Sequence, residues 1–408
     1  MTKGLIYRYF DDLHPLIQVI KQAYEGSKVC IIFHNHIPRA DTDTLSAAVS
    51  LWMIFKYLRK FPYHNLRIMG SGKAEGRALN TLQYFQNILK DEKFKVEFIE
   101  DPENMETIYC NQLIVVDTDF ERAGFKPSHF KVKDNIIILD HHPKLDDIKL
   151  LEQMKESSFC KIDQINCSIL EGKNLSSSTS QLMFPLIQFL QPFFKELMLE
   201  ENMVLEAKEF GKDFLQKYYK ITRAGIQTDT GGFSYSKTDN ALLCVGKFLE
   251  NFEDFGPFEI EQSEFSNVTQ LKYSKADLDT IRKIYDIIDI TDDGIVSLVC
   301  DSKDFYHPAF GIYSTLSPIH FCQNFKHIAC IAIRWETQKD HSIIGKIELR
   351  SSSEKYPIRP FALRYGGNGH SLASGAMVKL DKEHAIEFEL KSNQIIAEFK
   401  KYIREECK

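Results

Sequence analysis

The sequence predicts an α/β protein with an N-terminal, doubly wound, mostly parallel sheet and a second, smaller α/β domain. Strand and helix patterns alternate over the first 150 residues, as in a parallel sheet with crossover helices. Continuous apolar runs such as Ile136–Leu139 are typical of strands buried on both faces. A stretch without a clear period, 251–275, precedes further strands. We expect domains at 1–250 and 281–408, a linker at 251–280, and the active site in the cleft between the domains.

The first domain should contain five strands, and each is read from a short run rich in apolar β-forming residues. The expected strands are Lys28–His34, Leu66–Met69, Lys95–Ile99, Leu113–Val116 and Ile136–Leu139. Helices are expected at Leu45–Arg59, which is rich in Ala, Leu and aromatic residues, and at Ala78–Leu89.

The pattern then weakens over 149–173, which we interpret as an insertion or a connecting loop. The Ser/Thr run 176–180 offers helix caps ahead of the apolar run Leu182–Leu190. The remaining expected helices are Val204–Tyr219, Asn240–Phe248 and Ala385–Arg404, and the expected strands of the second domain are Ile295–Cys300, His327–Arg334 and Ile343–Leu349.

Composition excludes several classes of protein. The chain has 408 residues, 43% hydrophobic and 26% charged, with a formal net charge of −6, which argues against a groove for extended duplex DNA. No apolar run reaches the length of a membrane span, and the N-terminus lacks the apolar region of a secretory signal. The nine cysteines form no C-x-x-C pair, as expected for reduced thiols in a cytoplasmic protein. An oligomer is compatible with the sequence.

The first candidate site follows the first strand, where His34 and His36 precede Asp41 and Asp43. A D-x-D sequence after a strand is often only a solvated loop or a helix cap. The nearby histidines favour a metal site, because two carboxylates one residue apart can each reach a different ion.

Two further strands end in the same residue types. Asp117 directly follows Leu113–Val116 and should point into the crevice at the strand ends, whereas Asp119 is better explained as a helix cap. Asp140, His141 and His142 follow the strand Ile136–Leu139. Carboxylates and imidazoles in an apolar setting need a partner, and a divalent metal is the expected one.

Asp229 gives a fourth signal, because the glycines after it would let the backbone approach a ligand closely. By itself this segment is also a plausible turn. Together, four strand or loop ends carrying His or Asp predict a metal centre in a fold that brings such ends together. Mixed Asp and His ligands suit Mn²⁺, with Mg²⁺ as the alternative, and two such ions would activate water and clamp phosphoryl oxygens.

A glycine-rich segment near the C-terminus, Gly366–His370, could bind phosphate through backbone N–H groups, although a turn required only for packing is the simpler reading. Arg350 precedes a run of serines and could grip a phosphate with two hydrogen bonds.

The order of these motifs resembles the DHH phosphoesterase family with its C-terminal companion domain, in particular its nanoRNase or oligoribonuclease-like members. The resemblance covers roughly 28–240 and 340–380 and implies two Mn²⁺ ions. It assigns His36 and Asp41 to one ion, Asp43, His141 and Asp229 to the other, and Asp117 to both as a bridge. His142 would face the scissile phosphate, Asp140 would orient a neighbouring histidine, and the substrate would also be held by Arg350, Gly366, Gly367, Gly369 and His370.

Two features depart from the family pattern. The family places its first histidine four residues before the D-x-D motif, whereas here His36 lies five and His34 seven residues before Asp41, so either could be the first ligand. Asn368 stands where the family commonly has glycine, and asparagine tolerates the left-handed conformation.

The resemblance implies a Mn²⁺-dependent phosphodiesterase that hydrolyses short oligoribonucleotides or dinucleotides to mononucleotides, and some relatives also act on 3′-phosphoadenosine 5′-phosphate. A RecJ-like exonuclease for single-stranded DNA is the nearest alternative, but it should carry an additional binding domain and a basic channel. A family-II pyrophosphatase shares the first motif, and the segment Gly366–His370 argues against it. A non-catalytic nucleotide-binding regulatory protein is the alternative from another class.

Overall fold

The structure is a computed structural model, and it divides the chain into two compact units, Met1–Gln270 and Leu271–Lys408. It describes residues 2–24, 26–33, 41–72, 77–118, 123–141, 161–166, 176, 178–191, 204–230, 239–258, 285–301, 319, 322, 325–337, 342–380 and 387–407. The division falls inside the expected linker, and the exact domain bounds stay predictions.

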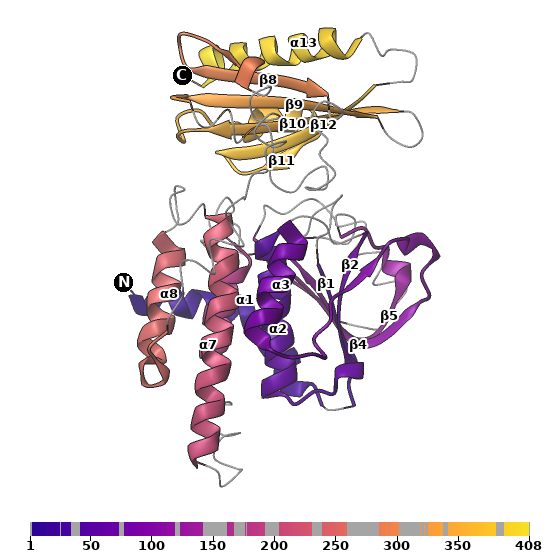
Figure 1. The fold of residues 1–408 in the computed structure, drawn as a ribbon, viewed down its shortest axis with the longest axis vertical. Coiled ribbons are helices and arrows are strands. Elements are labelled where there is room, and N and C mark those ends of the chain that lie inside the picture. Colours follow the sequence, from indigo (N-terminus) through magenta and orange to yellow (C-terminus); the bar gives the residue numbers. More distant parts are fainter. Residues whose placement is uncertain are drawn as a thin grey trace. The chain divides into compact units, whose positions relative to one another are not determined.

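The first unit is built on a six-stranded parallel sheet in the order β3-β2-β1-β4-β5-β6 (Figure 1). Its strands are β1 Val29–Phe33, β2 Leu66–Ser71, β3 Glu97–Ile99, β4 Ile108–Val116, β5 Phe130–Asp140 and β6 Lys161–Asn166. The strand order reverses between β1 and β4, and in such sheets ligands bind beyond the carboxyl ends at this point.

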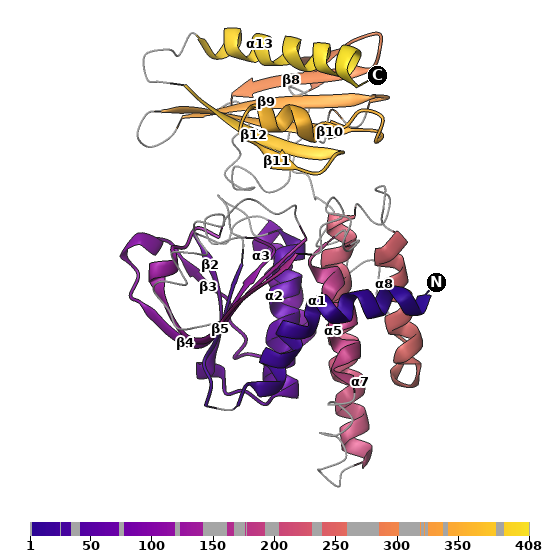
Figure 2. The same ribbon diagram turned by 180° about the vertical axis from the view of Figure 1, so that it is seen from behind.

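Helices cover one face of this sheet, and Figures 1 and 2 both show α2 and α7 on the same side of it. The helices are α1 Thr2–Gln22, α2 Thr42–Met53, α3 Arg77–Leu89, α5 Met183–Phe189, α7 Val204–Asp229 and α8 Asp239–Asn251. A π-helical turn, Ile54–Leu58, continues α2, and short 3-10 helices lie at Tyr63–Asn65, Pro102–Asn104, Pro127–His129, Ser180–Leu182 (η6) and Glu253–Phe255. On the opposite face the described residues include a second core, in which Ala123 and Phe125 pack on the strands.

The second unit has a mixed sheet in the order β11-β12-β10-β9-β8-β7, in which only the β8–β9 pair is parallel. Its strands are β7 Asp289–Ile290, β8 Ile295–Asp301, β9 Ala329–Thr337, β10 Ile343–Ser351, β11 Asn368–Gly369 and β12 Ala373–Leu380. The helices α12 Arg359–Arg364 and α13 Glu387–Lys401 supply Phe361, Ile395 and Phe399 to its main core, and a π-helical turn, Tyr402–Glu406, follows α13.

The expected two-domain α/β fold, with a parallel sheet first and a smaller α/β unit second, is therefore confirmed. Other elements differ from the sequence reading. In the first unit α1 was not expected, β6 lies in the segment read as an insertion or loop, β4 and β5 begin before their expected starts, and α7 runs ten residues past its expected end at Tyr219. In the second unit β7, α12, β11 and β12 were not expected. Among the described helices, none is long and apolar enough to cross a membrane.

Candidate metal centre

Three side chains from three separate elements converge in the first unit. Asp43 lies in the first turn of α2, His141 directly follows β5, and Asp229 is the last residue of α7. One potential ligand atom from each of the three lies within 4.8 Å of the others. These are the residues that the resemblance assigns to a single ion, and their role as ligands stays a prediction.

Nε2 of His141 lies among carboxylate oxygens. It is 3.3 Å from Oδ1 of Asp117, 3.4 Å from Oδ2 of Asp229 and 3.9 Å from Oδ2 of Asp43. A protonated His141 could neutralise only one of these three carboxylates. Because Asp43 and Asp117 are almost fully buried, the remaining negative charge favours a cation of higher charge at this position.

The strand ends place these residues together. Asp117 follows β4 immediately and adopts φ 61°, while its backbone N–H donates a hydrogen bond of 2.7 Å to the carbonyl oxygen of Leu139 on β5. The chain therefore turns directly at the carboxyl edge of the sheet, and asparagine or aspartate accepts this left-handed conformation better than most residues.

Close packing of α7 brings Asp229 to the same edge. A Cβ atom on Gly225 would lie 2.2 Å from Oγ of Ser180 and 2.6 Å from Cβ of Ser46, so only glycine fits between α7, η6 and α2. The hydroxyl groups of Ser50 on α2 and Thr222 on α7 are 2.9 Å apart in the same contact. Asp229 thus reaches the site from the end of a helix, not from a strand end or loop as its sequence context suggested.

The segment around Thr179 holds Asp43, a role that the sequence analysis missed. The backbone N–H groups of Thr179 and Ser180 donate hydrogen bonds of 2.7 and 2.9 Å to the two carboxylate oxygens of Asp43. The hydroxyl of Ser180 also donates to the backbone carbonyl of Asp43 over 2.9 Å. The sequence of the Ser/Thr run predicts helix caps, but its residues that contact Asp43 lie 136 and 137 residues away along the chain and leave no local signature.

Hydroxyl groups hold Asp117 from two sides. Thr179 donates to Oδ1 over 2.6 Å, and Thr44 on α2 donates to Oδ2. Thr179 therefore contacts both Asp43 and Asp117.

Burial makes these carboxylates costly to ionise. It is the main cause that raises the pKa of Asp43 to about 6, with the charge of Asp41 as the second cause. Burial also raises the pKa of Asp117 well above its usual range, and the charges of Asp43, Asp41 and Asp140 add to the effect. A bound divalent cation would oppose both effects by favouring the charged carboxylates.

The donor set fits a divalent metal. Each oxygen of Asp43 accepts one backbone hydrogen bond, which leaves a lone pair on both oxygens. Two carboxylates and one imidazole whose potential ligand atoms lie within 4.8 Å of one another suit Mn²⁺ or a similar ion.

The structure describes some of the other expected site residues and not the rest. Asp41 is the N-cap of α2 and accepts a hydrogen bond of 2.8 Å from the backbone of Thr44, so the cap reading weighed for this motif is correct for its side chain. Asp140, the last residue of β5, is buried and close enough to raise the pKa of Asp117. His34, His36 and His142 lie outside the described residues, as do Asp119 and the glycines after Asp229.

The expected substrate residues of the second unit lie on β10 and beside β12. Gly366 and Gly369 have φ 68° and 135°, and a Cβ on Gly367 would lie 2.1 Å from the carbonyl oxygen of Gly375. Packing against β12 thus explains the glycine at 367, as the simpler reading held. The side chain of Arg350, on β10, donates to the carbonyl oxygen of Leu349 over 2.8 Å, and the backbone N–H of His370 bonds to Ala373.

No family model and no curated protein matches the chain. Among solved structures, an exopolyphosphatase-related protein from Bacteroides fragilis is similar, with a TM-score of 0.62 and 17% identity over 97% of this chain and 98% of the other. Two further matches have TM-scores too low to support an argument. A pGpG-specific phosphodiesterase from Vibrio cholerae has a TM-score of 0.28 and 13% identity, covering 81% of this chain and 99% of its own. A protein from Helicobacter pylori G27 has a TM-score of 0.18 and 12% identity, covering 91% and 99%. At 17% identity, the first similarity shows that this chain shares the two-domain fold of the Bacteroides fragilis protein.

Proposed function

We propose that this protein is a Mn²⁺-dependent phosphodiesterase that hydrolyses short oligoribonucleotides or dinucleotides to mononucleotides. The convergence of Asp43, His141 and Asp229, with one potential ligand atom of each within 4.8 Å of the others, is the observation that carries the proposal. The fold shared with an exopolyphosphatase-related protein supports hydrolysis at a phosphoryl group, and the motif order of DHH phosphoesterases supports a phosphoester as the substrate.

In this proposal Asp43, His141 and Asp229 would hold one ion, His36 and Asp41 would help to bind a second, and Asp117 would serve both. Bound metal would supply a Lewis acid that lowers the pKa of water and neutralises phosphoryl oxygens. Hydrogen bonds within the chain hold the proposed ligands in position. Thr179, Ser180 and Thr44 fix the orientation of Asp43 and Asp117, so little reorganisation is needed when substrate binds.

His142 is proposed to face the scissile phosphate as a hydrogen-bond donor, with Asp140 orienting a neighbouring histidine. Arg350 and His370, together with the backbone at Gly366, Gly367 and Gly369, are proposed to hold a phosphate or sugar of the substrate. Among the described residues no carboxylate pairs with Arg350, so its guanidinium can accept a phosphate without breaking an ion pair.

A substrate panel tests the proposal. The purified full-length protein is incubated with Mn²⁺, Mg²⁺ or EDTA and one substrate at a time, and the products are identified by chromatography. The panel contains RNA of two to five nucleotides, single-stranded DNA, 3′-phosphoadenosine 5′-phosphate, cyclic dinucleotides and pyrophosphate. We expect mononucleotide release from the shortest RNAs, with Mn²⁺ and not with EDTA.

The other outcomes discriminate among the alternatives. Preferential degradation of long single-stranded DNA would replace the proposal by the RecJ-type reading. Tight binding of a nucleotide without turnover of any substrate would favour a regulatory protein.

A further inference from the structure

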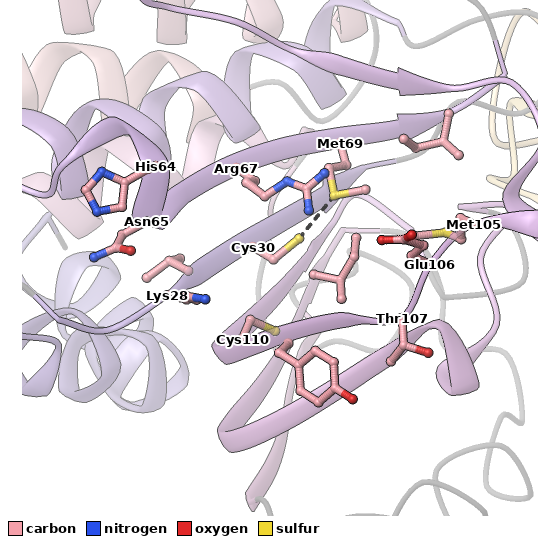
Figure 3. A pocket seen from close by; sticks show the side chains of 14 residues that line it. Lys28, Cys30, His64, Asn65, Arg67, Met69, Met105, Glu106, Thr107 and Cys110 are labelled. Carbon is pink, nitrogen blue, oxygen red and sulfur yellow. Dashed lines mark hydrogen bonds between the residues drawn. The ribbon is translucent and has the colours of Figure 1, made fainter.

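A cavity of about 380 Å³ opens in the first unit at the opposite end of the strands from the metal centre (Figure 3). Its lining includes residues 28–30 where β1 begins and residues 105–110 where β4 begins. Asn65, Arg67 and Met69 line it at and after the start of β2, and Ile99 lines it from the short edge strand β3. Asp43, Asp117 and His141 instead follow the carboxyl ends of the strands. The cavity therefore shares no residue with the metal centre.

The floor of the cavity is apolar and rich in sulfur. Cys30, Met69 and Cys110 are buried and line it, and Sγ of Cys30 is 3.5 Å from Sδ of Met69 (Figure 3). Burial raises the pKa of the Cys30 thiol, so this thiol is neutral at physiological pH. Sulfur atoms make favourable contacts with aromatic rings, and such a floor suits a planar aromatic group.

Two positively charged side chains, Lys28 and Arg67, line the cavity. Glu97 holds the Arg67 guanidinium with a hydrogen bond of 2.9 Å from Nε and a second from Nη2, which leaves Nη1 for another acceptor. Lys28 is exposed and makes no ion pair with another described residue. One negatively charged group of a ligand could therefore bind here without displacing a protein carboxylate.

The opposite rim carries a negative charge. Figure 3 shows Glu106 and Thr107 across the cavity from Lys28 and His64. Glu106 would repel a second anionic group and can accept a hydrogen bond from an N–H or O–H group of a ligand. The two sides thus differ in charge, which gives a bound molecule a preferred direction.

We propose that this cavity is a second binding site, for a small planar aromatic molecule that carries one anionic group. Its volume lies at the lower end of the range for small-molecule pockets, about 300–1,000 Å³. The aromatic part lies on the sulfur-rich floor, the anionic group lies near Lys28 and Arg67, and polar ring atoms face Glu106. This proposal does not depend on the activity proposed above.

Fluorescence titration with 8-anilinonaphthalene-1-sulfonate, an aromatic molecule with one sulfonate, tests the proposal on the full-length protein. Thr107→Trp should block the cavity, and Lys28→Glu should weaken binding about tenfold or more by reversing the charge near the sulfonate. Glu106→Lys should strengthen binding, because it removes the repulsive charge. Lys133→Glu, at an exposed lysine on β5 outside the lining, is the matched control and should leave binding unchanged.

Thr107, Lys28 and Glu106 are exposed, and circular dichroism with thermal melting establishes that each variant is folded. One saturable site in the wild type with the expected order of the variants supports the proposal. Three results would each overturn the proposal. They are wild-type affinity in a folded Thr107→Trp variant, equal weakening by Lys28→Glu and Lys133→Glu, and absence of saturable binding to the wild type. If Thr107→Trp does not fold, the opposite signs expected for Lys28→Glu and Glu106→Lys decide the question.

Discussion

The hydroxyl group of Thr179 donates a hydrogen bond of 2.6 Å to Oδ1 of Asp117. The backbone N–H of the same residue donates to Asp43, so one residue supports two of the carboxylates in the candidate metal centre. Partners of this kind orient metal ligands, and their loss typically reduces metal affinity by 10–100-fold.

Replacing Thr179 by valine should weaken Mn²⁺ binding by about 10–100-fold, because Asp117 loses a donor while the backbone bond to Asp43 remains. Thr179→Ser keeps the hydroxyl and should restore most of the affinity. Isothermal titration with Mn²⁺ gives the affinities. Thr81→Val is the control, since Thr81 is equally buried and shares a hydrogen bond of 3.1 Å with Thr42. Equal losses of Mn²⁺ affinity in both valine variants would refute a specific role of Thr179.

Asp117→Asn should abolish both full metal occupancy and hydrolysis, because the proposed bridge between two ions needs both charged oxygens. Asparagine is the better replacement, since Asp117 has φ 61° and alanine would add backbone strain of about 1–2 kcal/mol. Metal content of the dialysed protein, measured by atomic emission, and the rate on an RNA dinucleotide are the readouts. Two tightly bound ions in the variant would contradict the bridging role.

The sequence predicted the parallel sheet and the carboxyl ends of most of its strands, because the signals for both are local. Runs such as Ile136–Leu139 identify buried strands, and the polar residue after each run marks the carboxyl edge of the sheet, where ligands bind in such folds. It did not predict α1, although Leu13, Leu16, Ile17 and Ile20 recur at helical spacing and are buried. The strand β6 was missed because Lys161–Asn166 has no continuous apolar run.

The parts of the site that escaped sequence reasoning depend on long-range packing. Thr179 and Ser180 contact Asp43 only after η6 docks beside α2, and no spacing in the chain encodes that contact. Asp229 was found by its motif but assigned to the wrong kind of element, because its helix continues past the point where the apolar pattern weakens.

His370→Ala should raise KM for short RNA and leave Mn²⁺ binding unchanged, because His370 belongs to the second unit and is proposed to contact substrate only. Steady-state kinetics and Mn²⁺ titration of the same preparation separate the two effects. His327→Ala is a suitable control, since His327 also lies in the second unit, on the chain just before β9, and has no proposed contact with substrate. A parallel loss of metal in His370→Ala would show that its role is misplaced.

Asp91 should make a small pH-dependent contribution to stability. Burial acts to raise the pKa of Asp91, but hydrogen bonds from Tyr63, the backbone of Lys93 and Tyr57 outweigh it and lower the pKa. Because the pKa of Asp91 is lower in the folded state, its ionisation stabilises the fold at pH values above the unfolded-state pKa of about 3.9. This stabilisation is lost as the pH falls through the folded-state pKa. Tyr63→Phe should therefore destabilise the protein by about 1 kcal/mol or less at pH 7, since Asp91 is partly exposed.

Urea unfolding of wild type and Tyr63→Phe at several pH values checks this expectation. The difference between the two proteins should shrink as the pH falls below about 4. Tyr24→Phe, at a tyrosine that is 58% exposed, serves as the control and should show no such trend. A difference that stays constant down to pH 3 would mean that the ionisation of Asp91 does not depend on Tyr63.

Gly225→Ala should damage both stability and metal binding, because the added Cβ would lie 2.2 Å from Oγ of Ser180 and 2.6 Å from Cβ of Ser46. Helix α7 must then shift away from α2 and η6, and Asp229 moves with it relative to His141. Overpacking of this kind costs about 1–3 kcal/mol.

Gly246→Ala on α8 provides the matched control, because its Cβ would meet no atom within 4 Å. There the same substitution should stabilise the helix by about 0.5–1 kcal/mol. Urea unfolding gives the free energies, and titration with Mn²⁺ tests the metal centre. If Gly225→Ala lowered stability but bound Mn²⁺ as the wild type does, the position of α7 would matter for folding and not for the placement of Asp229.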